Sequence, residues 1–358
     1  MPSLKEIKGR INSISSTLAI TSAMKMVAAA KLQKAQMAIQ NMLPYERRLH
    51  SMLIDLMGAM NISAAASEDG SVRGSGSAER GFDQSGDRLS LSNRHDLAGM
   101  DGAYSLMAQR EVRKVAIVAF ASNSSLCGAF NSNAIREATA VINEYRASGL
   151  RDSDIVVYSV GRKMAEAMKK LGFPSPADFT KMSDSPSYDA ASALAQELFD
   201  GFVSGRFDKV ELVYNHYKST SSQPTTRQTY LPLSLADATA DLQAGKITDP
   251  ASETDTNRVA EPVGAPVVRQ GSPTTEDLIV EPSKEALIAT LLPKVIRLRI
   301  FTTLLDSAAA EHAARTVAMQ LATDNGNDLL QELTLEYNKG RQQKITSEIL
   351  DLVGGSLQ

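Results

Sequence analysis

The end of the chain carries the pattern of a single long helix. After Pro293 there is no further proline, and apolar or small residues recur at intervals of three and four as far as Gly354 and Gly355. The series includes Ile300, Leu304, Ala308, Leu330, Leu333, Tyr337, Ile345, Ile349 and Leu352. A helix from about Pro293 to the glycine pair would be roughly 90 Å long, at about 1.5 Å per residue. Such a helix is too long for one compact domain and is predicted to protrude.

The beginning of the chain offers a partner for this helix. Its apolar residues keep the same spacing, and the register continues to about Met60. The series begins Leu4, Ile7, Ile11, Ile14, Leu18 and ends Leu49, Leu53, Leu56. Two narrow apolar seams at opposite ends of one chain predict an antiparallel coiled coil, and the alanines at 28–30 and 308–310 would let the backbones approach closely. A bend is expected near Pro44. The alternative is a pair of ordinary core helices in a globular domain.

Composition limits the class of protein. The 358 residues are 43% hydrophobic and 22% charged, which is enough to bury a core in more than one structural unit. A net charge of -3 argues against wholesale binding to nucleic acid. The first 48 residues nevertheless hold eight lysines and arginines and only two glutamates. A basic rod would suit an acidic partner surface, although a solvated helix face is the commoner explanation.

Several kinds of site are poorly supported. The single cysteine, Cys127, excludes an internal disulfide and fits a reducing compartment. The four histidines are scattered, so a histidine-based metal site is not expected. No apolar run reaches the length of a membrane span, and no signal-peptide core precedes Leu4.

The middle of the chain alternates between strand and helix patterns. Strands are predicted at 114–120, 154–160, 209–216 and 227–233, with the last two antiparallel, and helices at 133–147, 162–171 and 190–205. This pattern indicates a small Rossmann-like α/β domain. Polar stretches flank it, the first with a possible short helix near 97–107. The predicted organisation is a helix at 1–60, an insertion at 61–109, the α/β domain at 110–233, a second insertion at 234–276 and a helix at 277–358.

Three local features could be read as chemistry. Residues 122–131 follow a strand and precede a helix, where α/β proteins bind phosphate, and Gly128 could approach an anion. The chain has neither of the usual glycine-rich nucleotide motifs, so a structural turn is favoured. Cys127 has no evident histidine and acid partners, which favours a buried thiol. Glu311 and His312 lack the second histidine of a zinc-protease motif.

Four separated motifs, in order, resemble one protein family. Residues 20–32, ITSAMKMVAAAKL, are similar to the N-terminal signature of the gamma subunit of the F-type ATP synthase. Residues 310–319, 322–327 and 335–346 resemble its C-terminal signature, and LCGAFN at 126–131 resembles its Leu-Cys-Gly-Gly turn. Residues 222–225 and 231–232 also fit. The resemblance covers nearly the whole chain outside the two polar insertions.

The resemblance implies a rotor without catalytic residues or cofactors. In this family the coiled coil is the central stalk inside a ring of alpha and beta subunits. The α/β domain sits at the foot, on the proton-driven c-ring and beside the epsilon subunit. An asymmetric shaft that turns would present a different face to each catalytic subunit and change its affinity for ADP, phosphate and ATP. The implied location is the cytoplasmic side of a bacterial inner membrane.

The resemblance also assigns contact residues. Contacts between the shaft and the alpha and beta subunits are assigned to Met24, Lys25, Arg315, Arg341, Gln342 and Thr346, with Gln342 and Thr346 in the catch that engages the catalytic subunits. Glu281 is assigned to the contact with the membrane ring. Leu278 and Ser125 depart from the family pattern, which often has an aromatic residue and a glycine there. For each assigned residue the alternative is an ordinary exposed helix position.

Other interpretations remain open at this point. Neither insertion contains cysteine, which excludes the thiol switch of chloroplast gamma subunits. A contact with epsilon or a ratchet against backward rotation is a hypothesis for the insertions, and tolerated surface loops are the alternative. The rival classes for the whole chain are a free-standing coiled-coil scaffold with an α/β domain and a phosphate-dependent α/β enzyme.

Overall fold

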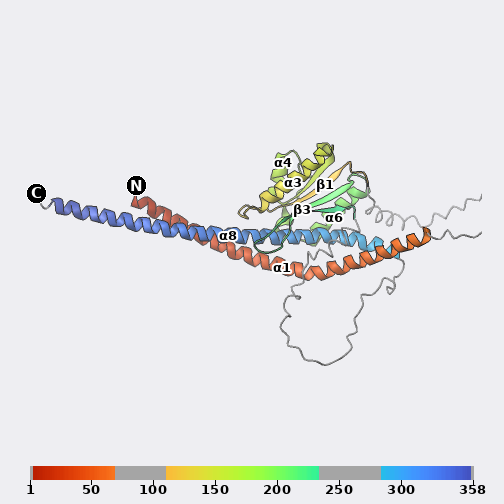
Figure 1. The fold of residues 1–358 in the computed structure, drawn as a ribbon, viewed down its shortest axis with the longest axis horizontal. Helices are drawn as coiled ribbons and strands as arrows, with labels where there is room; N and C mark the ends of the chain where they lie inside the picture. Colours follow the sequence, from red (N-terminus) through yellow and green to blue (C-terminus); the bar gives the residue numbers. More distant parts are fainter. Residues whose placement is uncertain (1–2, 69–109, 234–283, 356–358) are drawn as a thin grey trace, which may run out of the picture.

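Two long helices form the body of the molecule. The computed structural model describes residues 3–68, 110–233 and 284–355. Helix α1 (Leu4–Glu68) and helix α8 (Lys284–Gly355) have 65 and 72 residues. They lie side by side and run in opposite directions, with both chain termini towards the same end of the rod (Figure 1). The predicted antiparallel pair of terminal helices is confirmed.

Both helices differ from the prediction at their ends. Helix α1 ends at Glu68 instead of near Met60, continues through Pro44, and changes direction along its length (Figure 1). Helix α8 begins at Lys284, between the starts expected at 277 and near Pro293, and continues through Pro293. A proline inside a helix costs about 3 kcal/mol. Ile288, Leu292 and Ile296 flank it and are almost completely buried, and their burial offsets this penalty.

Two glycines of α8 allow close approach along the rod, at positions other than the alanines named from the sequence. A Cβ atom placed on Gly326 would lie 2.6 Å from Leu18 Cδ2, and one on Gly340 would lie 3.1 Å from Leu4 Cδ2. Thr323 Oγ1 donates a hydrogen bond of 3.1 Å to Thr21 Oγ1, three residues from Gly326 and Leu18 on the side away from Gly340. These pairs fix the register of α1 against α8.

The rod ends in a single helix. Since Leu4 lies opposite Gly340, α8 continues beyond the start of α1, and Figure 1 shows its C-terminal end projecting alone. The seam was predicted to continue to Leu352, and this is wrong. Ile345, Ile349 and Leu352 are 47%, 54% and 74% exposed because α1 offers no residues to cover them.

A small α/β domain lies against one side of the rod (Figure 1). Its sheet has the order β2-β1-β3-β4, in which β1 is parallel to β2 and β3 and β4 is antiparallel to β3. The strands are β1 (Val115–Phe120), β2 (Ile155–Val160), β3 (Lys209–Asn215) and β4 (Thr225–Leu231). The helices are α3 (Phe130–Ala147), η2 (Asp152–Asp154), α4 (Arg162–Lys170), α5 (Thr180–Asp184) and α6 (Tyr188–Val203). The predicted strands and helices are present within a few residues, whereas η2 and α5 were not anticipated.

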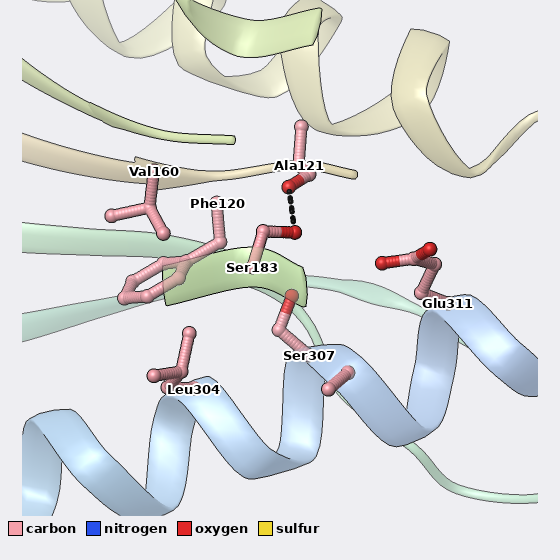
Figure 2. Close-up of a pocket in the computed structure, with 8 residues that line it drawn as sticks. Phe120, Ala121, Val160, Ser183, Leu304, Ser307 and Glu311 are labelled. Carbon is pink, nitrogen blue, oxygen red and sulfur yellow. Dashed lines mark hydrogen bonds between the residues drawn. The ribbon is translucent and has the colours of Figure 1, made fainter. Parts of the chain in front are cut away.

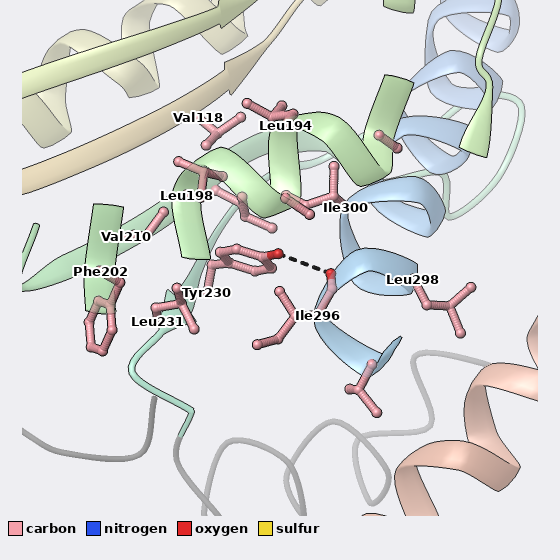
Figure 3. Packing of buried hydrophobic residues seen from close by; sticks show 14 of the residues in the cluster. Val118, Leu194, Leu198, Phe202, Val210, Tyr230, Leu231, Ile296, Leu298 and Ile300 are labelled. Atoms are coloured by element: carbon pink, nitrogen blue, oxygen red, sulfur yellow. Dashed lines mark hydrogen bonds between the residues drawn. The ribbon is translucent and has the colours of Figure 1, made fainter. Parts of the chain in front are cut away.

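The sheet is covered on both faces. Val115, Ile117 and Ala119 pack with residues of α3 and α4, while Val118 and Phe120 face α6 and the rod. Burial on both faces explains why β1 is apolar throughout. On the rod side, residues of α6, β4 and α8 form one core, in which the Tyr230 hydroxyl donates a 3.0 Å hydrogen bond to the Ile296 carbonyl (Figure 3).

Several expectations lie outside the described residues: the short helix near 97–107, the insertion at 61–109 beyond residue 68, the insertion at 234–276 and the placement of Glu281. In the part of the chain that the structure describes, no helix is both long enough and apolar enough to cross a membrane.

Candidate functional site

The topology of the sheet points to one edge. From β1 the chain passes to β2 on one side and then crosses to β3 on the other, so the strand order reverses at the carboxyl ends of β1 and β3. Ligands of open α/β sheets bind at such a reversal. Here that edge faces α8, and Leu304, Ser307 and Glu311 of this helix lie next to Phe120 and Ala121 at the end of β1 (Figure 2).

The space left at this edge is small. A cavity of about 10 Å³ remains between the end of β1, α5 and α8. Its polar walls are Ser183, whose hydroxyl donates a 3.0 Å hydrogen bond to the Ala121 carbonyl, and Ser307 and Glu311 (Figure 2). A cavity of this size holds about one water molecule. It is too small for a phosphate group, so the chain's own helix takes the place of a ligand.

The turn after β1, residues 121–129, is built as a structural turn. The amide of Asn131 donates to the Ser124 carbonyl and to Cys127 Sγ, at 3.1 and 3.2 Å, while its oxygen accepts the backbone N–H of Ser122 at 3.0 Å. Gly128 has φ 59°, and a Cβ atom on it would lie 3.8 Å from Ala318 Cβ of α8. Cys127 is 1% exposed. These contacts favour the structural turn and the buried thiol over a phosphate site or a nucleophile.

Arg315 joins this turn to α8. Its guanidinium donates to Glu311 Oε1 at 2.8 Å and to Ser124 Oγ at 2.7 Å. Burial raises the pKa of the Glu311 carboxyl above its usual value, and the charge of Arg315 opposes this rise. Burial, together with the positive charges of Arg315 and Lys31, lowers the pKa of the neighbouring His312 to about 4, so this imidazole is neutral at pH 7. His312 therefore adds no charge to the junction, which is the contact between α8 and the turn after β1.

The connection between β3 and β4, residues 216–224, makes a second attachment. Asp306 of α8 pairs with His216 Nδ1 at 2.6 Å through one oxygen and accepts the backbone N–H of Tyr217 at 2.9 Å through the other. The Tyr217 hydroxyl accepts a 2.7 Å hydrogen bond from Gln36 of α1. This connection therefore contacts both helices of the rod.

A buried charge cluster lies on the sheet, away from the rod. Glu211 is 1% exposed, and its carboxylate meets Lys209 Nζ at 2.6 Å, Arg227 Nε at 2.7 Å and the Tyr145 hydroxyl at 2.6 Å. Glu144 also pairs with Arg227. Sequence reasoning missed this cluster, although a glutamate inside an otherwise apolar strand was a usable signal. Its groups are satisfied by one another, which is the mark of a structural cluster.

The assigned shaft residues fall in three places. Met24 and Lys25 are half-buried on α1, whereas Arg341, Gln342 and Thr346 are exposed on the projecting part of α8. Arg315 is at the junction with the α/β domain, roughly 39 Å along the helix from Arg341. The structure therefore does not bring Arg315 together with the proposed catch. Among the described residues, no group of three histidine, cysteine or acidic side chains is placed to hold a metal ion.

Comparison with known proteins gives the family. A family model described as ATP synthase matches residues 3–357. The ATP synthase gamma chain of Phocaeicola vulgatus is 47% identical over 357 residues, which are 100% of both chains. That of Bacteroides thetaiotaomicron is 44% identical over 358 residues, again 100% of both. The chain belongs to the ATP synthase gamma chain family.

The family prediction made from the four motifs is thereby confirmed. The fold agrees independently. The rotor of the Euglena gracilis mitochondrial ATP synthase contains a chain that matches with a TM-score of 0.50 at 17% identity, over 96% of this chain and 98% of that one. At this identity the match shows the fold alone.

Proposed function

We propose that the chain is the turning shaft of a proton-translocating ATP synthase and couples rotation of a membrane ring to ATP synthesis and hydrolysis. The observation that supports this proposal is the projecting end of α8. Ile345, Ile349 and Leu352 are apolar, exposed and beyond the reach of α1. Apolar side chains on an unpaired helix are stabilised when a partner covers them, and the alpha and beta subunits would form that partner.

Within this proposal the contact residues act at two levels of the shaft. Arg341, Gln342 and Thr346 lie beside the exposed apolar residues and would form the catch for the catalytic subunits. Met24 and Lys25 would contact the alpha and beta subunits nearer the middle of α1. Arg315 is already bound to Glu311 and Ser124, so we assign it a contact made from the junction with the α/β domain.

The foot of the shaft would meet the membrane ring. Glu281 is the proposed ring contact, and the epsilon subunit would lie beside the α/β domain. Both assignments come from the family resemblance. With them we propose that the chain lies at the cytoplasmic side of an inner membrane, held there through its partners.

Reconstitution tests the proposal. The chain is mixed with the alpha and beta subunits of the same enzyme, the complex is isolated by size, and ATP hydrolysis is measured. A variant truncated after Arg341 removes most of the projecting end, and one truncated after Gly355 removes only three residues and serves as the control. We expect assembly to require the chain, and turnover to fall only with the longer truncation.

The opposite result would favour the scaffold alternative. In that case the chain would remain a folded monomer beside the other subunits, and turnover would be the same with or without it. A phosphate-dependent enzyme would instead turn over or bind its ligand alone, and the 10 Å³ cavity at the sheet edge argues against that class.

A further inference from the structure

We propose that the edge of the sheet at the carboxyl ends of β1 and β3 is a torsional joint, at which the α/β domain holds α8 and turns the rod with it. The joint consists of the β1–α3 turn (residues 121–129), the β3–β4 connection (residues 216–224) and their partners on the rod, Asp306 and Arg315 of α8 and Gln36 of α1. The inference rests on the proposed rotor function and names the contacts that would carry its torque.

The two attachments to α8 lie on opposite sides of the helix. Asp306 and Arg315 are nine residues apart, which is about two and a half turns at about 3.6 residues per turn. The β3–β4 connection binds Asp306 on one side, and Ser124 of the β1–α3 turn binds Arg315 on the other. Contacts on both sides resist rotation of a helix about its own axis, whereas a single contact would act as a pivot.

Tyr217 extends the joint to the second helix. It packs against the cluster formed by Leu32 of α1 with Ala309 and Ala313 of α8, and against the cluster formed by Cys127, Phe130 and Ala310. Its hydroxyl accepts the hydrogen bond from Gln36. One side chain therefore touches both helices and the α/β domain, so a rotation of the domain displaces the two helices together.

The polar contacts supply what apolar packing does not. Burial of the face that α6 and β4 share with α8 holds the domain on the rod, but the hydrophobic effect has no preferred direction. Hydrogen bonds to the Asp306 carboxylate, at 2.6 and 2.9 Å, weaken steeply when their angle changes. They are therefore suited to fixing the angle between the domain and the rod.

The test measures torsional stiffness in the assembled complex. The alpha and beta subunits are fixed to a surface, and a probe is attached to the α/β domain through Ala140→Cys, an exposed position of α3; the native Cys127 is buried. The angular distribution of the probe is recorded without ATP, and rotation is then recorded with ATP. We expect Asp306→Ala to broaden the angular distribution relative to the parent complex.

Matched variants separate the joint from general stability. Asp306→Asn can still accept the Tyr217 N–H and donate to a neutral His216, so it should keep the parental width. Arg146→Ala removes an exposed ion pair with Asp152 inside the domain and should not broaden the distribution. Gln36→Leu leaves α8 untouched and should broaden the angular distribution less than Asp306→Ala does. If Asp306→Ala does not fold, the width measured for Gln36→Leu tests the joint in its place.

The outcomes are distinct. Equal widths for Asp306→Ala and the parent, or an Asp306→Asn distribution as broad as that of the alanine variant, would overturn the joint. If Asp306→Ala does not fold, an unchanged width in Gln36→Leu would do the same. A parent complex that does not assemble, or whose probe does not turn with ATP, would instead remove the proposed rotor function.

Discussion

At the scale of single residues, the α/β domain depends on a charged group in its interior. Burial alone would raise the pKa of Glu211, but hydrogen bonds from Arg227, Lys209 and Tyr145 hold it below its usual value of 4.5. A depressed pKa means that the ionised form of Glu211 is more stable in the folded domain than in the unfolded chain. The stability that this provides is present above pH 4.5 and is lost as the pH falls through the lower, folded pKa.

Removing the charge of Glu211 should therefore destabilise the domain in a pH-dependent way. We expect Glu211→Gln to lower the free energy of unfolding at pH 7 by about 3 kcal/mol, because Lys209 and Arg227 lose a buried counter-charge. The difference from the parent should shrink as the pH falls below 4.5, because the parental carboxyl is then protonated first in the unfolded chain and, at lower pH, in the folded domain. Urea unfolding at pH 7 and at pH 3.5 measures both effects.

Glu144→Gln is the matched control for this experiment. Glu144 pairs with the same Arg227, but its side chain is 61% exposed, so its loss should cost less than about 1 kcal/mol. Equal destabilisation by the two variants would mean that burial of Glu211 does not set its contribution.

At the scale of the elements, close packing between α1 and α8 sets how the two helices of the rod fit together. Leu18 of α1 packs into the space left by Gly326 of α8, where a Cβ atom would come within 2.6 Å of Leu18 Cδ2. A glycine inside a helix costs up to about 1 kcal/mol relative to alanine. Its presence in the middle of α8 is explained by the close approach of the two helices.

Filling this space should separate the helices. We expect Gly326→Val to destabilise the rod by about 1–3 kcal/mol, the usual cost of overpacking. Leu18→Ala in the same chain should recover part of this loss, because it removes the side chain that the valine meets. Thermal unfolding of the four chains of the double-mutant cycle gives the coupling between the two positions.

A purely additive cycle would contradict the packing of Leu18 against Gly326. The partial recovery is expected to be specific to this pair: Leu4→Ala, near Gly340, should not recover the stability lost in Gly326→Val, because it lies near a different glycine of the same helix.

At the scale of the whole molecule, the rod has two parts with different support. Where α1 and α8 run together, and where the α/β domain covers α8, tertiary packing stabilises the helix. Beyond Gly340 only local interactions remain, such as the exposed pair of Lys344 and Glu348 at 3.7 Å. An isolated helical segment as short as residues 341–355 is marginally stable in water.

This difference predicts the order of proteolysis. In the isolated chain, trypsin should cleave after Arg341 and Lys344 before it cleaves after Arg315, whose side chain is 12% exposed and bound to Glu311 and Ser124. Binding to the alpha and beta subunits should slow cleavage at the first two sites. Mass spectrometry of the fragments over time follows all three sites in one experiment.

Cleavage after Arg315 as fast as after Arg341 would show that the junction is not better protected than the projecting end. Unchanged rates at Arg341 and Lys344 in the assembled complex would contradict the proposed catch.

The sequence alone determined the elements and the family. Apolar residues at three- and four-residue spacing specified both long helices, since this periodicity places them on one face. The continuous apolar run of β1 specified a strand buried on both sides, and four ordered motifs gave the gamma chain family. Helix ends were less well determined, because periodicity cannot weigh the cost of Pro293 against the burial of Ile288 and Ile296 around it.

Only the tertiary structure decided how these elements work together. No local pattern shows that α8 extends beyond the start of α1. The register of the two helices depends on the packing of Leu4 against Gly340 and of Leu18 against Gly326. Ser124, which Arg315 binds in the β1–α3 turn, is 191 residues away in sequence, and His216 and Tyr217, which bind Asp306, are about 90 residues away. Such contacts form only once the sheet has brought the ends of β1 and β3 together against the rod, so the junction, unlike the helices, could not be deduced from neighbouring residues.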